Sequence, residues 1–143
     1  MKFSYVVGNP PYQDVRGARL VDMWSPFIEK ASKVGNSSCM IHPGRWLLSQ
    51  SGVHAKNRNK MIQNGLNTFK YYPKSEDVFS GVSIDGGISI TITKENYSGD
   101  IHYYIEDIDK GIYKENEKIF CSNFQEEAFN KTFASIDTKL NMS

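Results

Sequence analysis

A polar amide, two prolines and an aromatic ring follow an apolar run near the start of the chain. The run Phe3 to Gly8 leads directly into Asn9-Pro10-Pro11-Tyr12. The amide oxygen of Asn9 and the backbone carbonyl of Pro10 can each accept one N–H of an amino group, which favours a pyramidal, nucleophilic nitrogen. The prolines stiffen the turn, so these acceptors are preorganised. The Tyr12 ring can stack on a flat base.

The residues before this turn predict a buried strand. Val6 and Val7 are β-branched strand formers, Gly8 allows a close backbone approach, and the prolines cannot continue a hydrogen-bonded ladder. In an open α/β sheet, ligands bind beyond the carboxyl ends of the strands, where this sequence places Asn9 to Tyr12. We therefore expect a site at the end of the first strand.

Three segments of the chain resemble the methylase part of Eco57I-type restriction-modification enzymes, which are N6-adenine DNA methyltransferases of the Asn-Pro-Pro-Tyr type. They are Tyr5-Val6-Val7-Gly8-Asn9-Pro10-Pro11-Tyr12-Gln13, Pro43-Gly44-Arg45-Trp46-Leu47 and Asp77-Val78-Phe79-Ser80-Gly81-Val82. Their order is the order found in the family, and the similarity covers roughly residues 3 to 97. The resemblance implies methyl transfer from S-adenosylmethionine to adenine in double-stranded DNA, with the target base flipped out of the helix.

The same resemblance implies roles for individual residues. Asn9, Pro10, Pro11 and Tyr12 would form the catalytic turn, and Tyr12 and Phe79 would stack on the flipped adenine. Basic side chains near these segments are candidates for contacts with DNA phosphates, with a solvated surface position as the alternative. These side chains are Arg16, Arg19 and Arg45.

Other functions fit part of this pattern. RNA and protein-glutamine N-methyltransferases also use Asn-Pro-Pro-Tyr, and a non-catalytic DNA-binding remnant would keep the fold. The segments around Arg45-Trp46 and Asp77 to Gly81 favour DNA. Trp46 and His42 are more typical of packing residues than of a ligand platform and a catalyst.

The remaining pattern predicts an α/β fold, and the resemblance implies a partial Rossmann-like methyltransferase sheet in which parallel strands are joined by an antiparallel edge strand. Spacing predicts a helix from Leu20 to Ala31 that begins at Ser25 or bends at Pro26, after a loop over residues 13–19. Further strands are expected at 37–42, 66–72 and 82–93, the last interrupted at Gly86-Gly87, and an exposed basic helix at 53–64.

The family binds S-adenosylmethionine mainly through a glycine-rich turn and an acidic residue that precede the Asn-Pro-Pro-Tyr strand. This sequence begins two residues before that strand. We therefore expect residues 1–97 to form the target-base half of a catalytic domain that is inactive alone. Residues 98–143 would add a strand and a helix over 125–136 that pack on it or lead to a recognition domain. The strand Phe3 to Val7 would have an unpaired edge, which favours self-association or a partner.

Composition limits the other classes of protein. The chain has 143 residues, enough for one domain, and a formal net charge of +1, so a DNA contact has to come from a local patch. Cys39 and Cys121 stand alone, which argues against a zinc site or a disulfide framework. No apolar run has the length of a membrane span, and the first residues do not resemble a signal peptide. We expect a cytoplasmic protein without a metal.

Overall fold

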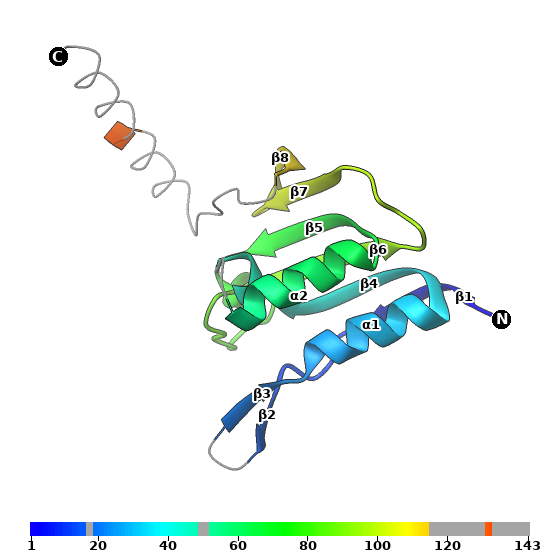
Figure 1. The fold of residues 1–143 in the computed structure, drawn as a ribbon. Coiled ribbons are helices and arrows are strands. Elements are labelled where there is room, and N and C mark those ends of the chain that lie inside the picture. Colours follow the sequence, from blue (N-terminus) through cyan, green and yellow to red (C-terminus); the bar gives the residue numbers. More distant parts are fainter. Residues whose placement is uncertain (17–18, 49–51, 115–130, 133–143) are drawn as a thin grey trace.

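A six-stranded sheet carries helices α1 and α2 on one face (Figure 1). The structure, a computed structural model, describes residues 1–16, 19–48, 52–114 and 131–132. In spatial order the strands are β1 (Phe3–Gly8), β4 (Gly35–Pro43), β6 (Ile88–Lys94), β5 (Leu66–Tyr72), β7 (Ile101–Ile105) and β8 (Ile108–Tyr113). β1 and β4 pair in parallel, as do β5 and β7, whereas β6 and β8 pair antiparallel with their neighbours. The predicted α/β class, with parallel and antiparallel strands, is confirmed.

The first crossover runs from β1 through α1 (Trp24–Val34) to β4. Pro26 lies in the first turn of α1, where its missing amide donor costs no intrahelical hydrogen bond, so the helix neither starts later nor bends there. Trp24, Ile28 and Ala31 face the sheet and are buried. The parallel register of β1 with β4 then places the ends of both strands on the same side of the molecule.

The segment before α1 differs from the prediction. Instead of a loop followed by helix, the chain forms an antiparallel hairpin of β2 (Gln13–Arg16) and β3 (Arg19–Asp22). Leu20 and Val21 therefore belong to a strand, although their spacing to Trp24 matched a helix. A pair of apolar residues is compatible with both periods, and pairing with β2 selects the extended one.

The predicted antiparallel strand is shorter than expected and lies inside the sheet. β6 begins at Ile88 and is hydrogen-bonded to β4 on one side and β5 on the other, so within this sheet it is not an edge strand. Residues 82–87 are outside it because Gly86 and Gly87 adopt positive φ angles of 85° and 74°. A side chain at Gly87 would clash with the Tyr72 carbonyl, at 2.3 Å from its Cβ, so the chain turns here rather than extending the strand.

The helices cover the polar face of β6. Ser89, Thr91 and Thr93 are at most 2% exposed, and each hydroxyl bonds to a side chain across the core. Ile90, on the opposite face, is only half-buried. Satisfied hydroxyls can be buried at little cost, so alternation alone did not reveal which face is the inner one.

The second crossover contains η1 (Arg45–Leu47) and α2 (Gly52–Gln63), and η2 (Ser75–Asp77) follows β5. The helix predicted at 53–64 is confirmed, but Arg58 is 4% exposed and donates to the Trp46 carbonyl at 2.8 Å, so it is not part of an exposed basic face. The helix predicted at 125–136 lies outside the described residues except for 131–132, which are helical.

Residues after 98 extend the same sheet through the β7–β8 hairpin, whereas one strand was predicted there. Glu106 and Asp107 turn the chain with φ angles of 50° and 65°. In the part of the chain described here, no helix has the length and apolarity that a membrane span requires.

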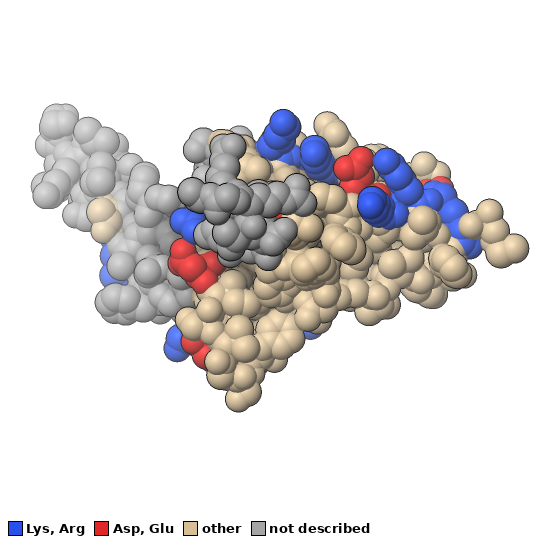
Figure 2. Space-filling model, turned by 90° about the horizontal axis from the view of Figure 1, so that it is seen from below, with Lys and Arg blue, Asp and Glu red and all other residues tan. Residues whose placement is uncertain are grey.

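Figure 2 shows that lysine and arginine side chains gather along one border of the molecule, while most of the face in view is uncharged. This uneven distribution agrees with the small net charge of the sequence. Contacts with a polyanion would therefore be local rather than spread over the surface.

Candidate functional site

The Asn9 to Tyr12 turn follows β1 at its carboxyl end. Asn9 is exposed and Pro10 is buried, and with Pro11 and Tyr12 they line a shallow hollow of about 380 Å³. The Tyr12 carbonyl accepts a hydrogen bond from the Met23 backbone N–H at 3.1 Å, which ties the turn to the start of α1. The amide of Asn9 is thus presented to solvent from a fixed backbone.

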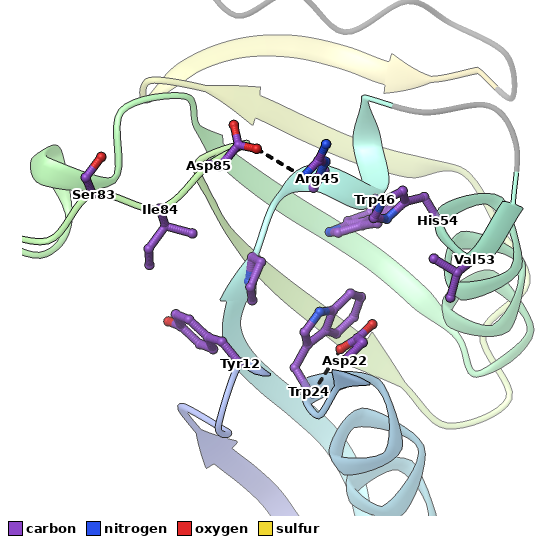
Figure 3. Close-up of a pocket in the computed structure, with 11 residues that line it drawn as sticks. Tyr12, Asp22, Trp24, Arg45, Trp46, Val53, His54, Ser83, Ile84 and Asp85 are labelled. Carbon is purple, nitrogen blue, oxygen red and sulfur yellow. Dashed lines mark hydrogen bonds and ion pairs between the residues drawn. The ribbon is translucent and has the colours of Figure 1, made fainter. Parts of the chain in front are cut away.

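A second, deeper hollow lies beside this turn, and we call it the aromatic hollow. Its volume is about 440 Å³, within the usual range of about 300–1,000 Å³ for small-molecule sites. It gathers side chains from the ends of β1, β3 and β4, the starts of α1 and α2, and the loop before β6 (Figure 3). The lining residues are Tyr12, Asp22, Trp24, Pro43, Arg45, Trp46, Val53, His54, Ser83, Ile84 and Asp85. Tyr12 lines both hollows, so they meet at its ring.

Asp22 supplies a carboxylate to the aromatic hollow. One of its oxygens accepts the Trp24 backbone N–H at 3.1 Å and the other accepts the Asn57 side-chain amide at 2.8 Å. Asn57 in turn accepts the Ser25 hydroxyl at 3.1 Å. Desolvation by burial raises the pKa of Asp22, and the hydrogen bonds from Trp24 and Asn57 oppose that shift. The network fixes the carboxylate against α1 and α2.

His42 lies beneath the two indoles of the hollow. Its ring stacks on Trp24 with centroids 4.3 Å apart and lies 6.2 Å from the Trp46 ring. It is fully buried, with Nε2 bonded to Thr91 at 2.9 Å and Nδ1 to the Pro43 carbonyl at 3.2 Å. Complete burial lowers the pKa of His42 to about 3, so the imidazole is neutral. The interpretation of His42 and Trp46 as packing residues agrees with this arrangement.

The rim of the hollow carries opposite charges. Arg45 pairs with Asp85 at 3.0 Å, and both side chains are largely exposed. On α2, burial and the neighbouring Arg45 and Arg58 lower the pKa of His54, and the Asp22 carboxylate opposes that shift. Among the described residues that line the hollow, Asp22 forms no ion pair, whereas Arg45 and Asp85 pair with each other.

The structure brings some predicted residues together and separates others. Asn9 to Tyr12 form one turn, and Arg45 shares the aromatic hollow with Tyr12. Phe79 is half-buried and lines neither hollow, although Ile84 from the same loop does line the aromatic one. Arg16 and Arg19 lie in the β2–β3 hairpin, and their side chains are outside the described part.

Sequence reasoning missed Asp22, Trp24, His54 and Ile84 as lining residues. Asp22 and Trp24 were read within or beside a helical pattern, and no local signal indicates that Ile84 reaches a site. They meet because the ends of separate elements converge beyond the parallel strands. Among the described residues, no cluster of three or more His, Cys, Asp or Glu side chains is arranged to hold a metal ion.

Comparison with known proteins gives the family. The model of the Eco57I restriction-modification methylase family matches residues 1–79, which include the Asn9 to Tyr12 turn and the Pro43 to Leu47 segment. An uncharacterized adenine-specific methylase of Mycoplasma pneumoniae is 32% identical over 108 residues, which are 69% of this chain and 25% of that protein. The chain thus spans about a quarter of the length of this curated relative.

Solved structures show the same fold at low sequence identity. The methyltransferase subunit of a type I restriction-modification system from Streptococcus thermophilus superposes with a TM-score of 0.57 at 15% identity, over 94% of this chain and 32% of that one. The M protein of the type I enzyme EcoKI gives a TM-score of 0.51 at 16% identity, over 73% and 25%. Since the family model covers 79 of the 143 residues, the chain belongs to the Eco57I restriction-modification methylase family.

Proposed function

We propose that this chain forms the target-base part of a cytoplasmic enzyme that methylates adenine N6 in double-stranded DNA within a restriction-modification system. The methyl donor is S-adenosylmethionine. The observation that carries this proposal is the Asn9-Pro10-Pro11-Tyr12 turn at the carboxyl end of β1, beside an aromatic hollow. The family match and the adenine-specific relative support adenine as the base.

The chemistry requires an amino nitrogen whose lone pair is withdrawn from the adenine ring. The Asn9 amide oxygen accepts one N–H of that amino group and the Pro10 carbonyl accepts the other, which favours a pyramidal nitrogen. Pro10 is buried and the Tyr12 carbonyl is bonded to Met23, so the backbone around both acceptors is held in place. The Tyr12 ring stacks on the flipped base.

The described residues do not fit a site for S-adenosylmethionine. Each of the two parallel strands β1 and β4 ends in a proline-containing segment rather than a glycine-rich turn. Gly44, the glycine that follows β4, faces the Tyr71 ring, whose Cε2 would lie 2.5 Å from an added Cβ, so no space remains there for the ribose of the cofactor. We assign these residues to the target base and place cofactor binding in another part of the complete enzyme.

The exposed face of β1 supports a partner for this chain. Among the described strands β1 pairs only with β4, and Phe3, Tyr5 and Val7 are 69%, 77% and 77% exposed. An apolar edge strand is a template for a further strand. We propose that the cofactor-binding part, or a second copy in its absence, adds a strand at this edge.

Substitution of Asn9 in the complete enzyme tests the proposed function. Asn9→Ala should reduce adenine methylation by about 10²-fold or more, by analogy with loss of one preorganised donor from an oxyanion hole. Asn59→Ala, at an exposed position on α2, is the matched control and should keep the parental rate. Parental methylation by a folded, cofactor-binding Asn9→Ala enzyme would show that the turn is only structural.

A further inference from the structure

The aromatic hollow contains a charged acceptor that is held by neutral donors. Both oxygens of Asp22 accept hydrogen bonds, from the Trp24 backbone and the Asn57 amide. The Ser25 backbone N–H also donates to this carboxylate, so about one of its roughly four lone-pair sites remains free for a further hydrogen bond. Arg45, the cation at the rim, is already paired with Asp85 at 3.0 Å. The hollow therefore favours a ligand that donates an N–H.

The same hollow contains a donor that lacks an acceptor. The Tyr12 hydroxyl oxygen is buried and has no hydrogen-bond partner among the described residues. A buried polar group in this state is costly, and an arriving acceptor would remove that cost. Figure 3 shows Tyr12 and Asp22 among the side chains that line the hollow, with Asp22 close to Trp24 and the hydroxyl end of Tyr12 pointing away from Asp22.

The walls between these two polar groups are aromatic and aliphatic. Tyr12, Trp24 and Trp46 contribute rings, and Pro43 and Ile84 contribute apolar surface. Flat heteroaromatic ligands gain stacking and dispersion from such walls. A ring that donates N–H at one edge and accepts at another is a nucleobase.

We propose that the aromatic hollow is a second nucleobase site, in which Asp22 accepts an N–H of the base and the Tyr12 hydroxyl donates to a ring nitrogen or carbonyl. Tyr12 lines this hollow and the shallow one at Asn9, so its ring separates the two sites. In the proposed reaction the occupant is the nucleotide that neighbours the target adenine on the same strand. This last step rests on the proposed function, whereas base binding in the hollow does not.

Tryptophan fluorescence of the chain reports on this hollow directly, because the sequence has two tryptophans and both line it. Adenosine should quench the emission, and purine riboside, which lacks the amino group, should bind about tenfold more weakly because the hydrogen bond to a charged acceptor is lost. This comparison needs no variant. Equal affinity for the two nucleosides, or no quenching by either at millimolar concentration, overturns the proposal.

Variants then locate the acceptor. Asp22→Asn should remove the tenfold preference for adenosine, whereas Asp100→Asn, at an exposed position outside the hollow, should retain it. Near-ultraviolet circular dichroism checks that Trp24 remains packed. Tyr12→Phe provides a second variant, which should lower the affinity for adenosine without changing its preference over purine riboside. A folded Asp22→Asn chain with the full preference would also overturn the proposal.

A dinucleotide series tests the occupant. A single-stranded DNA dinucleotide should bind more tightly than the same strand with an abasic site beside the adenine, and Asp22→Asn should abolish that difference. An unchanged affinity for the abasic strand contradicts the assignment to the neighbouring base. These measurements of binding do not depend on methylation. The base site in the hollow can therefore be confirmed when the Asn9→Ala test fails, and it can be rejected when that test succeeds.

Discussion

The imidazole of His42 stacks on the indole of Trp24, with ring centroids 4.3 Å apart and planes inclined by 15°. His42 is a buried residue near the end of β4, and Trp24 is the first residue of α1. Their contact therefore joins the sheet to the helix, directly below the aromatic hollow. A neutral ring suits this position because the described hydrogen-bond partners of His42 are uncharged, so a buried imidazolium would lack an acid to pair with.

The depressed pKa of His42 predicts a pH dependence of stability. Between its ordinary value of 6.5 and about 3, the unfolded chain binds a proton that the folded chain does not. The free energy of unfolding should therefore fall as pH decreases below 6.5, by up to about 1.4 kcal/mol per pH unit from this residue. Urea unfolding at pH 7, 5.5 and 4.5 measures it.

The contribution of His42 is isolated by a matched pair of variants. His42→Gln keeps a hydrogen-bonding group near Thr91 and should flatten the pH dependence, at the cost of a lower stability at pH 7. Asn59→Gln, at an exposed position on α2 without a titratable side chain, should keep the parental slope. An identical slope for His42→Gln would mean that the folded protein accepts the proton.

The loop before β6 is expected to contact two different bases, the flipped adenine through Phe79 and its neighbour through Ile84. Phe79→Ala in the complete enzyme should weaken binding of DNA with a mispaired target adenine by about 1–3 kcal/mol if Phe79 stacks on it. Ile84→Ala should weaken DNA binding by a different route, because Ile84 lines the aromatic hollow proposed for the neighbouring base and Phe79 does not. Phe27→Ala, on exposed α1 surface, is the control. Loss of affinity with Ile84→Ala alone would remove Phe79 from the site.

The chain alone should bind S-adenosylmethionine weakly or not at all. The described strand ends have no glycine-rich turn, and the Tyr71 ring packs against Gly44. Isothermal titration calorimetry of the isolated chain, with the complete enzyme as positive control, measures this. Micromolar affinity for a monomeric chain would show that its own residues form the cofactor site.

The isolated chain should associate through β1. Phe3, Tyr5 and Val7 expose apolar side chains on a strand that has one described neighbour, so a second strand would remove both exposed surface and unpaired backbone groups. Sedimentation velocity should show dimers or larger species at high concentration. Val7→Lys should shift them toward monomer, and Ile112→Lys, at the opposite edge of the sheet, should not. A strictly monomeric parental chain would contradict the prediction.

The sequence by itself determined the turn and the strand that presents it, but the predicted burial of that strand is wrong, because Phe3, Tyr5 and Val7 are exposed. Two valines, a glycine and then Asn9-Pro10-Pro11-Tyr12 carry local information about extension, close approach and termination, and β1 ends where this pattern predicts. The βαβ crossover to β4 and the strand β5 were also predicted correctly, since each shows its own periodicity and a stop signal.

Only the tertiary structure decided where β6 lies in the sheet, that the face of β6 with the hydroxyl side chains is the buried one, and which residues line the aromatic hollow. Strand order depends on pairing between segments that are distant in the sequence, and the residue pattern of a strand does not show which strand it pairs with. Ser89 and Thr91 became interior residues because Trp46 and His42 satisfy their hydroxyls. Ile84 lies far along the chain from Asp22 and Trp24, and the three residues meet because separate elements end at the same side of one sheet.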